Sequence, residues 1–130
     1  MIRVLVAEDE TVMRDTLVAL LGLEADIEVA VAVAAGDEVV SAAVKHRPDV
    51  AVLDVGMPGL DGISAADRLA GRVPGCRVLI FTGMAAPATV AAALRAGVSG
   101  YLLKDGSASE LIAAVRAVAN GERFMDARLG

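Results

Sequence analysis

The sequence predicts an α/β fold of the flavodoxin-like class, in which five βα units form three layers around a parallel sheet with the strand order 2-1-3-4-5. Short runs rich in Val, Ile and Leu alternate five times with segments whose apolar residues recur at helical spacing. These runs are apolar throughout, as in parallel strands that are buried on both faces. The 130 residues correspond to one domain with a core of its own.

Five strands are expected where an apolar run ends in polar or turn residues. They cover residues 2–7, 27–33, 50–54, 77–82 and 100–103. Crossover connections between parallel strands are right-handed, so five consecutive units place helices on both faces of the sheet.

Five helices are expected after the strands, over residues 11–23, 36–46, 62–70, 87–96 and 108–119. Pro48 ends the second helix, and Pro87 suits the first turn of the fourth. Gly97 is expected to end the fourth helix in a left-handed conformation. Ser107 and Glu110 have the spacing of a capping box, which marks the start of the last helix.

The composition excludes several classes of protein. Although 56% of the residues are hydrophobic, no apolar run is long enough to cross a membrane, and the first residues lack the organisation of a signal peptide. A net charge of -5 and only 2% aromatic residues argue against nucleic-acid binding by this segment itself. Cys76 is the single cysteine and is expected to be structural. Because it cannot form an internal disulfide, a reducing, cytoplasmic location is predicted.

Polar residues end or directly follow four of the predicted strands and meet at the carboxyl edge of the sheet, where open α/β sheets bind ligands. They are Glu8 and Asp9, Asp54, Thr82 and Lys104. Clustered carboxylates repel one another unless they hold protons or a cation, and ligands that are all oxygens suit Mg²⁺. Asp54 is therefore predicted to be a nucleophile that forms an aspartyl-phosphate, with the charge of the phosphoryl group neutralised by Mg²⁺ and Lys104.

Each of these residues also has an ordinary interpretation. Asp54 suits a turn or a helix cap. Glu8, Asp9 and Glu10 suit the first turn of a helix, where the dipole favours acids. Thr82 could simply end a strand, and Lys104 could be a solvated loop charge. The joint interpretation is favoured because the residues follow four different strands of one sheet.

Segments around these residues resemble the receiver domain of two-component response regulators, which has a CheY-like fold. The resemblance covers nearly the whole chain and rests on residues 6–10, 48–54, 57–62, 82 and 96–105. The form Gly-Tyr-Leu-Leu-Lys-Asp in the last segment is similar to the NarL/FixJ subfamily, whose members usually carry a C-terminal helix-turn-helix domain that binds DNA.

The resemblance implies that a sensor histidine kinase transfers a phosphoryl group from a phosphohistidine to Asp54. It implies a Mg²⁺ ion held directly by Asp9 and Asp54, through water by Glu8, and by the backbone carbonyl of Gly56. Gly56 leaves the approach of water open, so a phosphoryl group with a short to moderate lifetime is expected.

The resemblance also implies roles for three further residues of this chain. Lys104 would pair with the phosphoryl group, Thr82 would bind it, and Tyr101 would be the aromatic switch residue that turns inward when Thr82 moves. Two positions depart from the common pattern: Glu8 stands where Asp is commoner, and Asp105 follows Lys104 where many receivers have Pro.

This interpretation divides the chain into a receiver domain at 1–121 and the start of an interdomain linker at 122–130, with the DNA-binding domain outside the chain. Regulation of transcription is the expected function, and a stand-alone receiver that acts through protein contacts is the alternative. A phosphatase-type enzyme is less favoured because Gly56 stands where such enzymes have a second Asp. A nucleotide-binding module would need a Gly-rich loop after the first strand, where this chain has acids.

The helices at 11–23 and 108–119 are apolar on more than one side, which indicates deep burial or a partner. A homodimer through these two helices is predicted. The alternatives are a dimer through the helix at 87–96 with the last strand and helix, and Ala-rich packing inside a monomer. His46 lies at a helix end, where an ordinary surface role is expected.

Overall fold

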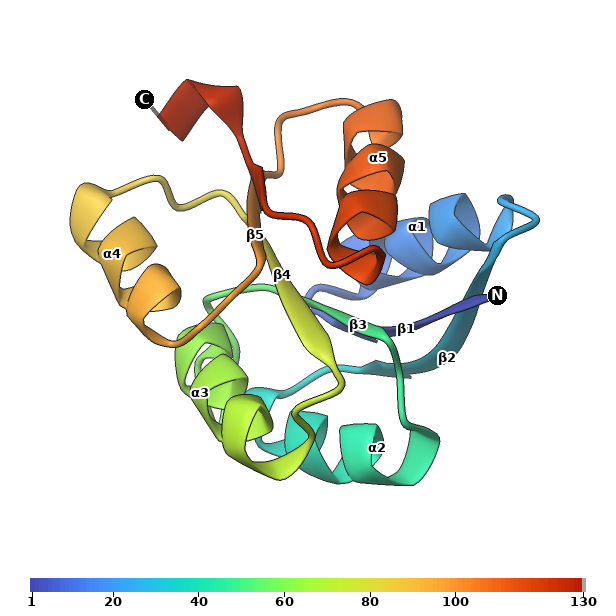
Figure 1. The fold of residues 1–130 in the computed structure, drawn as a ribbon, viewed down its shortest axis with the longest axis horizontal. Coiled ribbons are helices and arrows are strands. Elements are labelled where there is room, and N and C mark those ends of the chain that lie inside the picture. Colours follow the sequence, from blue (N-terminus) through green and yellow to red (C-terminus); the bar gives the residue numbers. More distant parts are fainter. Residues whose placement is uncertain (130) are drawn as a thin grey trace.

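The computed structural model describes residues 1–129, which form a parallel six-stranded sheet in the order β2-β1-β3-β4-β5-β6 (Figure 1). The predicted order of the first five strands is confirmed. The strands are β1 (Ile2–Ala7), β2 (Ile27–Val33), β3 (Val50–Leu53), β4 (Arg77–Thr82), β5 (Gly100–Leu103) and β6 (Phe124–Met125). The third strand ends at Leu53, one residue earlier than predicted, so Asp54 begins the following loop.

Five α-helices cover the two faces of the sheet. They are α1 (Thr11–Gly22), α2 (Val39–His46), α3 (Gly62–Arg72), α4 (Pro87–Arg95) and α5 (Ala108–Ala119). Helices α1 and α5 lie on one face, and α2, α3 and α4 lie on the other (Figure 1). Among the described residues, no helix is long and apolar enough to cross a membrane.

The helix boundaries agree with the predicted ones to within one residue, with two exceptions. The capping box between Ser107 and Glu110 is present, and Gly97 has a φ of 87° after α4. The second helix begins as a short 3₁₀ turn, η1 (Gly36–Glu38), whose first N–H donates to the carbonyl of Pro58. The third helix runs two residues further than predicted, to Arg72.

The strand β3 forms the centre of the core, and all four of its residues are buried. Ala51 and Leu53 pack in the layer beneath α2, α3 and α4, whereas Val50 and Val52 pack beneath α1 and α5. The alternation of side chains along a strand sends successive residues to opposite faces, so a strand covered on both faces is apolar at every position. Because β3 is held on both faces, Asp54 directly after it starts from a rigid position.

The segment after α5 continues the sheet, which the sequence did not predict. Phe124 and Met125 form β6 and pair in parallel with Gly100 and Tyr101 of β5. A second 3₁₀ turn, η2 (Ala127–Leu129), follows β6. Residues 122–129 therefore pack on the edge strand of the receiver-like fold.

Candidate functional site

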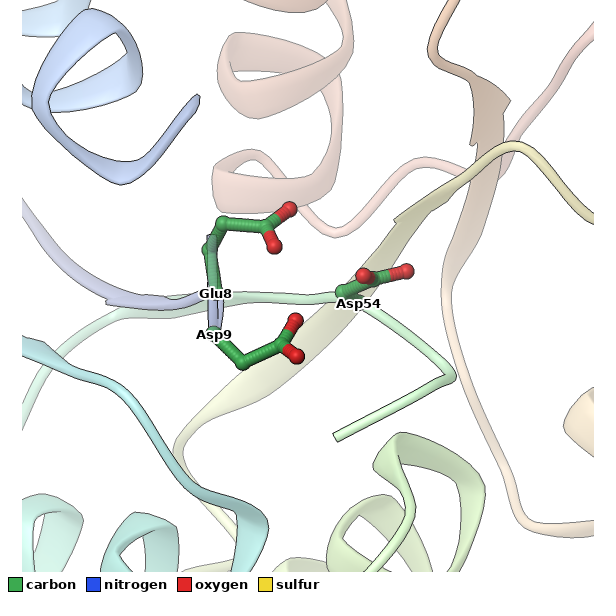
Figure 2. Close-up of side chains that lie close together, drawn as sticks. All are labelled: Glu8, Asp9 and Asp54. Carbon is green, nitrogen blue, oxygen red and sulfur yellow. The ribbon is translucent and has the colours of Figure 1, made fainter. Parts of the chain in front are cut away.

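Three carboxylates lie together at the carboxyl edge of the sheet. Glu8 and Asp9 follow β1, and Asp54 follows β3, which is paired with β1 through Ala7 and Leu53. One oxygen from each carboxylate lies within 4.8 Å of the others. Figure 2 shows the three side chains close together, with Glu8 and Asp9 on the segment after β1 and Asp54 on the segment after β3. The predicted acidic cluster is therefore present.

Lys104 joins two of these carboxylates from the end of β5. Its Nζ lies 2.5 Å from Oε1 of Glu8 and 3.1 Å from Oδ2 of Asp54. Burial alone would lower the pKa of Lys104, but hydrogen bonds to Glu8 and Asp54 outweigh that effect and raise it. The backbone N–H of Lys104 donates to the carbonyl of Thr82, which fixes the end of β5 against β4. Lys104 is thus an ionised, positioned ammonium group rather than a solvated loop charge.

Glu8 is almost completely buried, with 1% of its surface exposed. Its Oε2 accepts the N–H of Glu10, so both carboxylate oxygens have partners. Helix α1 begins only at Thr11, and its first turn contains no acidic residue. The ordinary interpretation of Glu8, Asp9 and Glu10 as first-turn acids is therefore wrong.

Asp54 combines a fixed orientation with partial access to solvent. Its Oδ1 accepts the N–H of Val55 at 2.8 Å, and its own N–H donates to the carbonyl of Ala7. The side chain remains 12% exposed. The turn interaction expected of an Asp is thus made by one oxygen, while the other faces Lys104.

Thr82 and Tyr101 are connected through the loop that follows β4. The hydroxyl of Thr82 accepts the N–H of Met84 at 3.3 Å, and the carbonyl of Met84 accepts the hydroxyl of Tyr101 at 2.5 Å. Tyr101 is fully buried, and this burial, together with the negative charge of Asp54, raises its pKa. The ring of Tyr101 therefore already points inward in this structure.

The donor set fits a hard divalent cation. Three carboxylates and one ammonium leave an excess of two negative charges if all four groups are ionised. Asp9 is exposed and lies at the open side of the cluster, whereas Glu8 is occupied by Lys104. All the available ligands are oxygens, which Mg²⁺ prefers. Gly56 lies in the exposed loop directly after the cluster, where a Cβ would contact nothing within 4 Å.

His46 and Cys76, which the sequence analysis also considered, do not belong to this cluster. The backbone carbonyl of His46 accepts a hydrogen bond from Arg3, near the start of β1 and therefore at the opposite end of that strand. Cys76 is buried, and burial raises the pKa of its thiol to about 11.

One contact to the end of β5 was missed by the sequence analysis. Asp126, which follows β6, is buried, and its carboxylate accepts the N–H of Leu103, next to Lys104. A single Asp in a short tail of mixed polar and apolar residues belongs to no periodic pattern that would mark it as buried.

The sequence of the chain matches the family described as Response regulator receiver domain over residues 4–116. The chain belongs to this family. Receiver domains are phosphoacceptor switches rather than enzymes with external substrates. Membership of this family therefore confirms the expectation that the chain is a phosphoacceptor switch rather than an enzyme.

The relatives of this receiver domain include transcription regulators. It is 42% identical over 124 residues to the transcriptional regulatory protein DesR of Bacillus subtilis, covering 95% of this chain and 61% of DesR. It is 37% identical over 128 residues to the transcriptional activator DevR/DosR of Mycobacterium tuberculosis, covering 98% of this chain and 59% of that protein. The receiver domain therefore spans about 60% of the length of these curated relatives.

A solved structure supports the same assignment. The signal receiver domain of the Mycobacterium tuberculosis response regulator named NarL superposes with a TM-score of 0.90 and 35% identity, covering 93% of this chain and 98% of that chain. The resemblance to the NarL/FixJ subfamily is thus confirmed.

Proposed function

We propose that this receiver domain accepts a phosphoryl group on Asp54 from a sensor histidine kinase. The observation that carries the proposal is the position of the Asp54 carboxylate, partly open to solvent and within 3.1 Å of a lysine ammonium beside two further carboxylates. Such an arrangement favours the gain of a phosphoryl group, because Lys104 neutralises charge that would otherwise repel it.

In the proposed reaction, a carboxylate oxygen of Asp54 attacks the phosphorus atom of a phosphohistidine. The new O–P bond forms as the P–N bond breaks, and the electron pair of that bond returns to the imidazole of the kinase, which then binds a proton. Lys104 exchanges its contact with Asp54 for a phosphoryl oxygen, and the hydroxyl of Thr82 donates to another. The transfer keeps the phosphoryl group in line between the nitrogen it leaves and the oxygen it joins.

A Mg²⁺ ion fits this site, with Asp9 and Asp54 as direct ligands, Glu8 acting through water and the backbone carbonyl of Gly56 as a further ligand. When bound, the ion would neutralise charge on the phosphoryl oxygens. The role proposed for Glu8 agrees with its contact to Lys104, which already occupies one of its oxygens.

The proposed output is regulation of a DNA-binding domain outside this chain. DesR and DevR/DosR are named as transcription regulators, and the chain matches about 60% of each. Residues 122–130 would begin the connection to that domain. A receiver that acts alone through protein contacts is the second candidate, and both would work in the cytoplasm, where histidine kinases deliver phosphoryl groups.

A homodimer through α1 and α5 is the proposed form of the switched state. Val12 on α1 and Leu23 just after it are 72% and 79% exposed. The alternative face, formed by α4, β5 and α5, has the edge of β5 paired with β6. This pairing reduces the backbone that the alternative face could offer to a second copy.

The test is incubation with acetyl phosphate and Mg²⁺, followed by the mass of the intact protein. We expect a mass gain of one phosphoryl group in the wild type and in Asp67→Asn, an exposed carboxylate on α3. Asp54→Asn is expected to gain none. A phosphoryl adduct that persists in Asp54→Asn would contradict the assignment of Asp54. A wild type that is labelled neither by acetyl phosphate nor by phosphorylated histidine kinases would contradict the proposed function.

A further inference from the structure

The segment after α5 is hydrogen-bonded to β5 and to the residue before it through its backbone. The N–H of Phe124 donates to the carbonyl of Ser99 at 3.1 Å, and the N–H of Asp126 donates to the carbonyl of Tyr101 at 2.9 Å. Figure 1 shows this C-terminal segment running along β5, beside α5. One of the two anchor points is therefore the backbone of the proposed switch residue.

The side chain of Asp126 makes one more hydrogen bond to β5. Its Oδ2 accepts the N–H of Leu103 at 3.0 Å. This bond continues the contact with β5 beyond Met125, where the backbone pairing of β5 with β6 ends. The residue is 4% exposed. A buried carboxylate is costly unless its oxygens have partners, so Asp126 holds a position that few other side chains could fill.

Arg128 supplies those partners. Its Nε and backbone N–H donate to Oδ1 of Asp126 at 2.9 and 3.0 Å, and its Nη2 donates to Oδ2 at 2.7 Å. These contacts hold the pKa of Asp126 well below its usual range. A further nitrogen, Nη1, donates to Oδ1 of Asp105 at 2.6 Å. We refer to Asp126, Arg128 and Asp105 as the tail clamp.

The tail clamp holds the residues on both sides of Lys104. Leu103 precedes Lys104 and donates to Asp126, and Asp105 follows Lys104 and pairs with Arg128. Lys104 itself reaches Glu8 and Asp54. A change in the position of Lys104 therefore strains the clamp, and loss of the clamp frees the backbone that carries Lys104.

We propose that Asp126 is a positioning residue of the phosphoacceptor site, and that docking of residues 122–129 on β5 and phosphorylation of Asp54 are coupled through Lys104. This inference rests on the proposed function. Energetic coupling between two sites is reciprocal. If a group that binds Lys104 changes the equilibrium for docking of the tail by some factor, docking of the tail changes the affinity for that group by the same factor. The segment that leads out of the domain is then part of the switch.

The test compares wild type with Asp126→Ala, Asp126→Asn and the control Arg123→Gln. Asp126→Ala removes the acceptor of the Leu103 N–H, whereas Asp126→Asn retains an amide oxygen that accepts it. Arg123 lies in the same tail and is exposed. Two quantities are measured: the initial rate of labelling by acetyl phosphate with Mg²⁺, and amide hydrogen exchange at Leu103 and residues 122–129, with and without Mg²⁺ and beryllofluoride.

In the wild type and Arg123→Gln, we expect Mg²⁺ with beryllofluoride to change exchange at Leu103 and in the tail by about fivefold or more. In Asp126→Ala, we expect exchange at Leu103 to be fast and insensitive to beryllofluoride, and the initial rate of labelling to be lower than in the wild type. Asp126→Asn is expected to recover part of both effects. A purely structural role would speed exchange equally in both conditions, without affecting its response to beryllofluoride.

A wild-type tail that exchanges equally with and without beryllofluoride, while Asp54 becomes labelled, would overturn the coupling and leave the proposed function intact. A wild type that neither binds beryllofluoride nor becomes labelled would overturn both. If Asp126→Ala does not fold, Arg128→Gln replaces it, because that variant removes the tie to Asp105 and retains the carboxylate. Labelling and tail exchange like those of wild type in Arg128→Gln and Asp126→Asn would then overturn the inference.

Discussion

Gly62, the first residue of α3, lies directly against the backbone carbonyl of Asp54. A Cβ on Gly62 would lie 1.9 Å from that oxygen, and 2.8 Å from the carbonyl carbon. The N–H of Gly62 also donates to the carbonyl of Val55, so the start of α3 is fixed to the loop that carries the phosphoacceptor. Only glycine permits this approach, and the site therefore depends on a residue that has no side chain.

Replacement of Gly62 with Ala is expected to destabilise the protein by about 1–3 kcal/mol, because the added methyl group forces the backbone apart. The same displacement should slow labelling of Asp54 by acetyl phosphate. Gly71→Ala is the matched control in the same helix, since a Cβ there contacts nothing within 4 Å. It should stabilise the protein by about 0.4–1 kcal/mol. Urea unfolding curves check both values, and equal effects of the two substitutions would contradict the role given to Gly62.

Replacement of Lys104 with Gln should reduce the rate of labelling by on the order of 100-fold, because a charge that stabilises the incoming phosphoryl group is lost. It should also lower the free energy of unfolding by up to about 3 kcal/mol, since buried Glu8 loses its cationic partner. Lys45→Gln is the control, because Lys45 is the only other lysine of the chain and is exposed on α2. Labelling by intact mass and urea unfolding give the two values. A normal rate in Lys104→Gln would refute the assignment.

Addition of Mg²⁺ should raise the unfolding midpoint of the wild type, with a gain of about 2.7 kcal/mol at a concentration 100-fold above the dissociation constant. Asp9→Asn should remove most of this gain. Without Mg²⁺, the variant should be slightly more stable than the wild type, because one of three clustered negative charges is gone. The control is Asp15→Asn, an exposed carboxylate on α1. Equal responses of the two variants to Mg²⁺ would exclude Asp9 as a ligand.

The thiol of Cys76 should react slowly with iodoacetamide while the protein is folded. Burial, with a further contribution from the charge of Asp49, raises its pKa to about 11. At pH 8 only about one thiol in a thousand would then be ionised, against roughly a quarter for a free cysteine. Because the folded-state pKa is above the unfolded value, this group contributes stability below pH 8.5, and the contribution is lost as the pH rises towards 11.

Alkylation is followed by mass at pH 8, with and without urea. The thiol should become reactive only when urea unfolds the protein, and Cys76→Ala should remove the signal in both conditions. Fast alkylation of the folded wild type would show that the thiol is accessible and ionised.

Replacement of Val12 with Glu should prevent the homodimer proposed for the phosphorylated state, because it introduces a charge into the exposed apolar surface of α1. Sedimentation velocity with Mg²⁺ and beryllofluoride measures the fraction of dimer. Val44→Glu on α2 should behave like wild type, since α2 covers the opposite face of the sheet. A dimer that survives in Val12→Glu and disappears in Leu94→Glu on α4 would favour the alternative face instead.

The features that the sequence predicted well depend on short patterns of neighbouring residues. The apolar runs marked the first five strands, the Ser107 and Glu110 spacing marked the start of α5, and Gly97 marked the end of α4. The acidic cluster was also predicted, because the topology brings the ends of β1 and β3 together whatever the details of packing.

The features that were missed depend on contacts between distant residues. Strand β6 has only two residues, too few for a periodic pattern, and its pairing partner lies in β5. The second helix starts with a 3₁₀ turn at Gly36, which packs so closely on Leu60 that a Cβ would lie 1.6 Å from the carbonyl oxygen of Leu60. The direct pairing of Lys104 with Glu8 joins residues 96 positions apart, and no local signal indicates it.

Strand β6 also changes what an isolated domain would present to its neighbours. An unpaired edge strand offers free N–H and C=O groups that can join another sheet, and short or covered edges prevent this association. Here β6 covers Gly100 and Tyr101 of β5, and it is itself only two residues long. A chain cut after Gly121 would uncover the longer, apolar strand Gly-Tyr-Leu-Leu. The residues after α5 thus protect the domain from edge-to-edge aggregation, and truncations should end beyond Arg128.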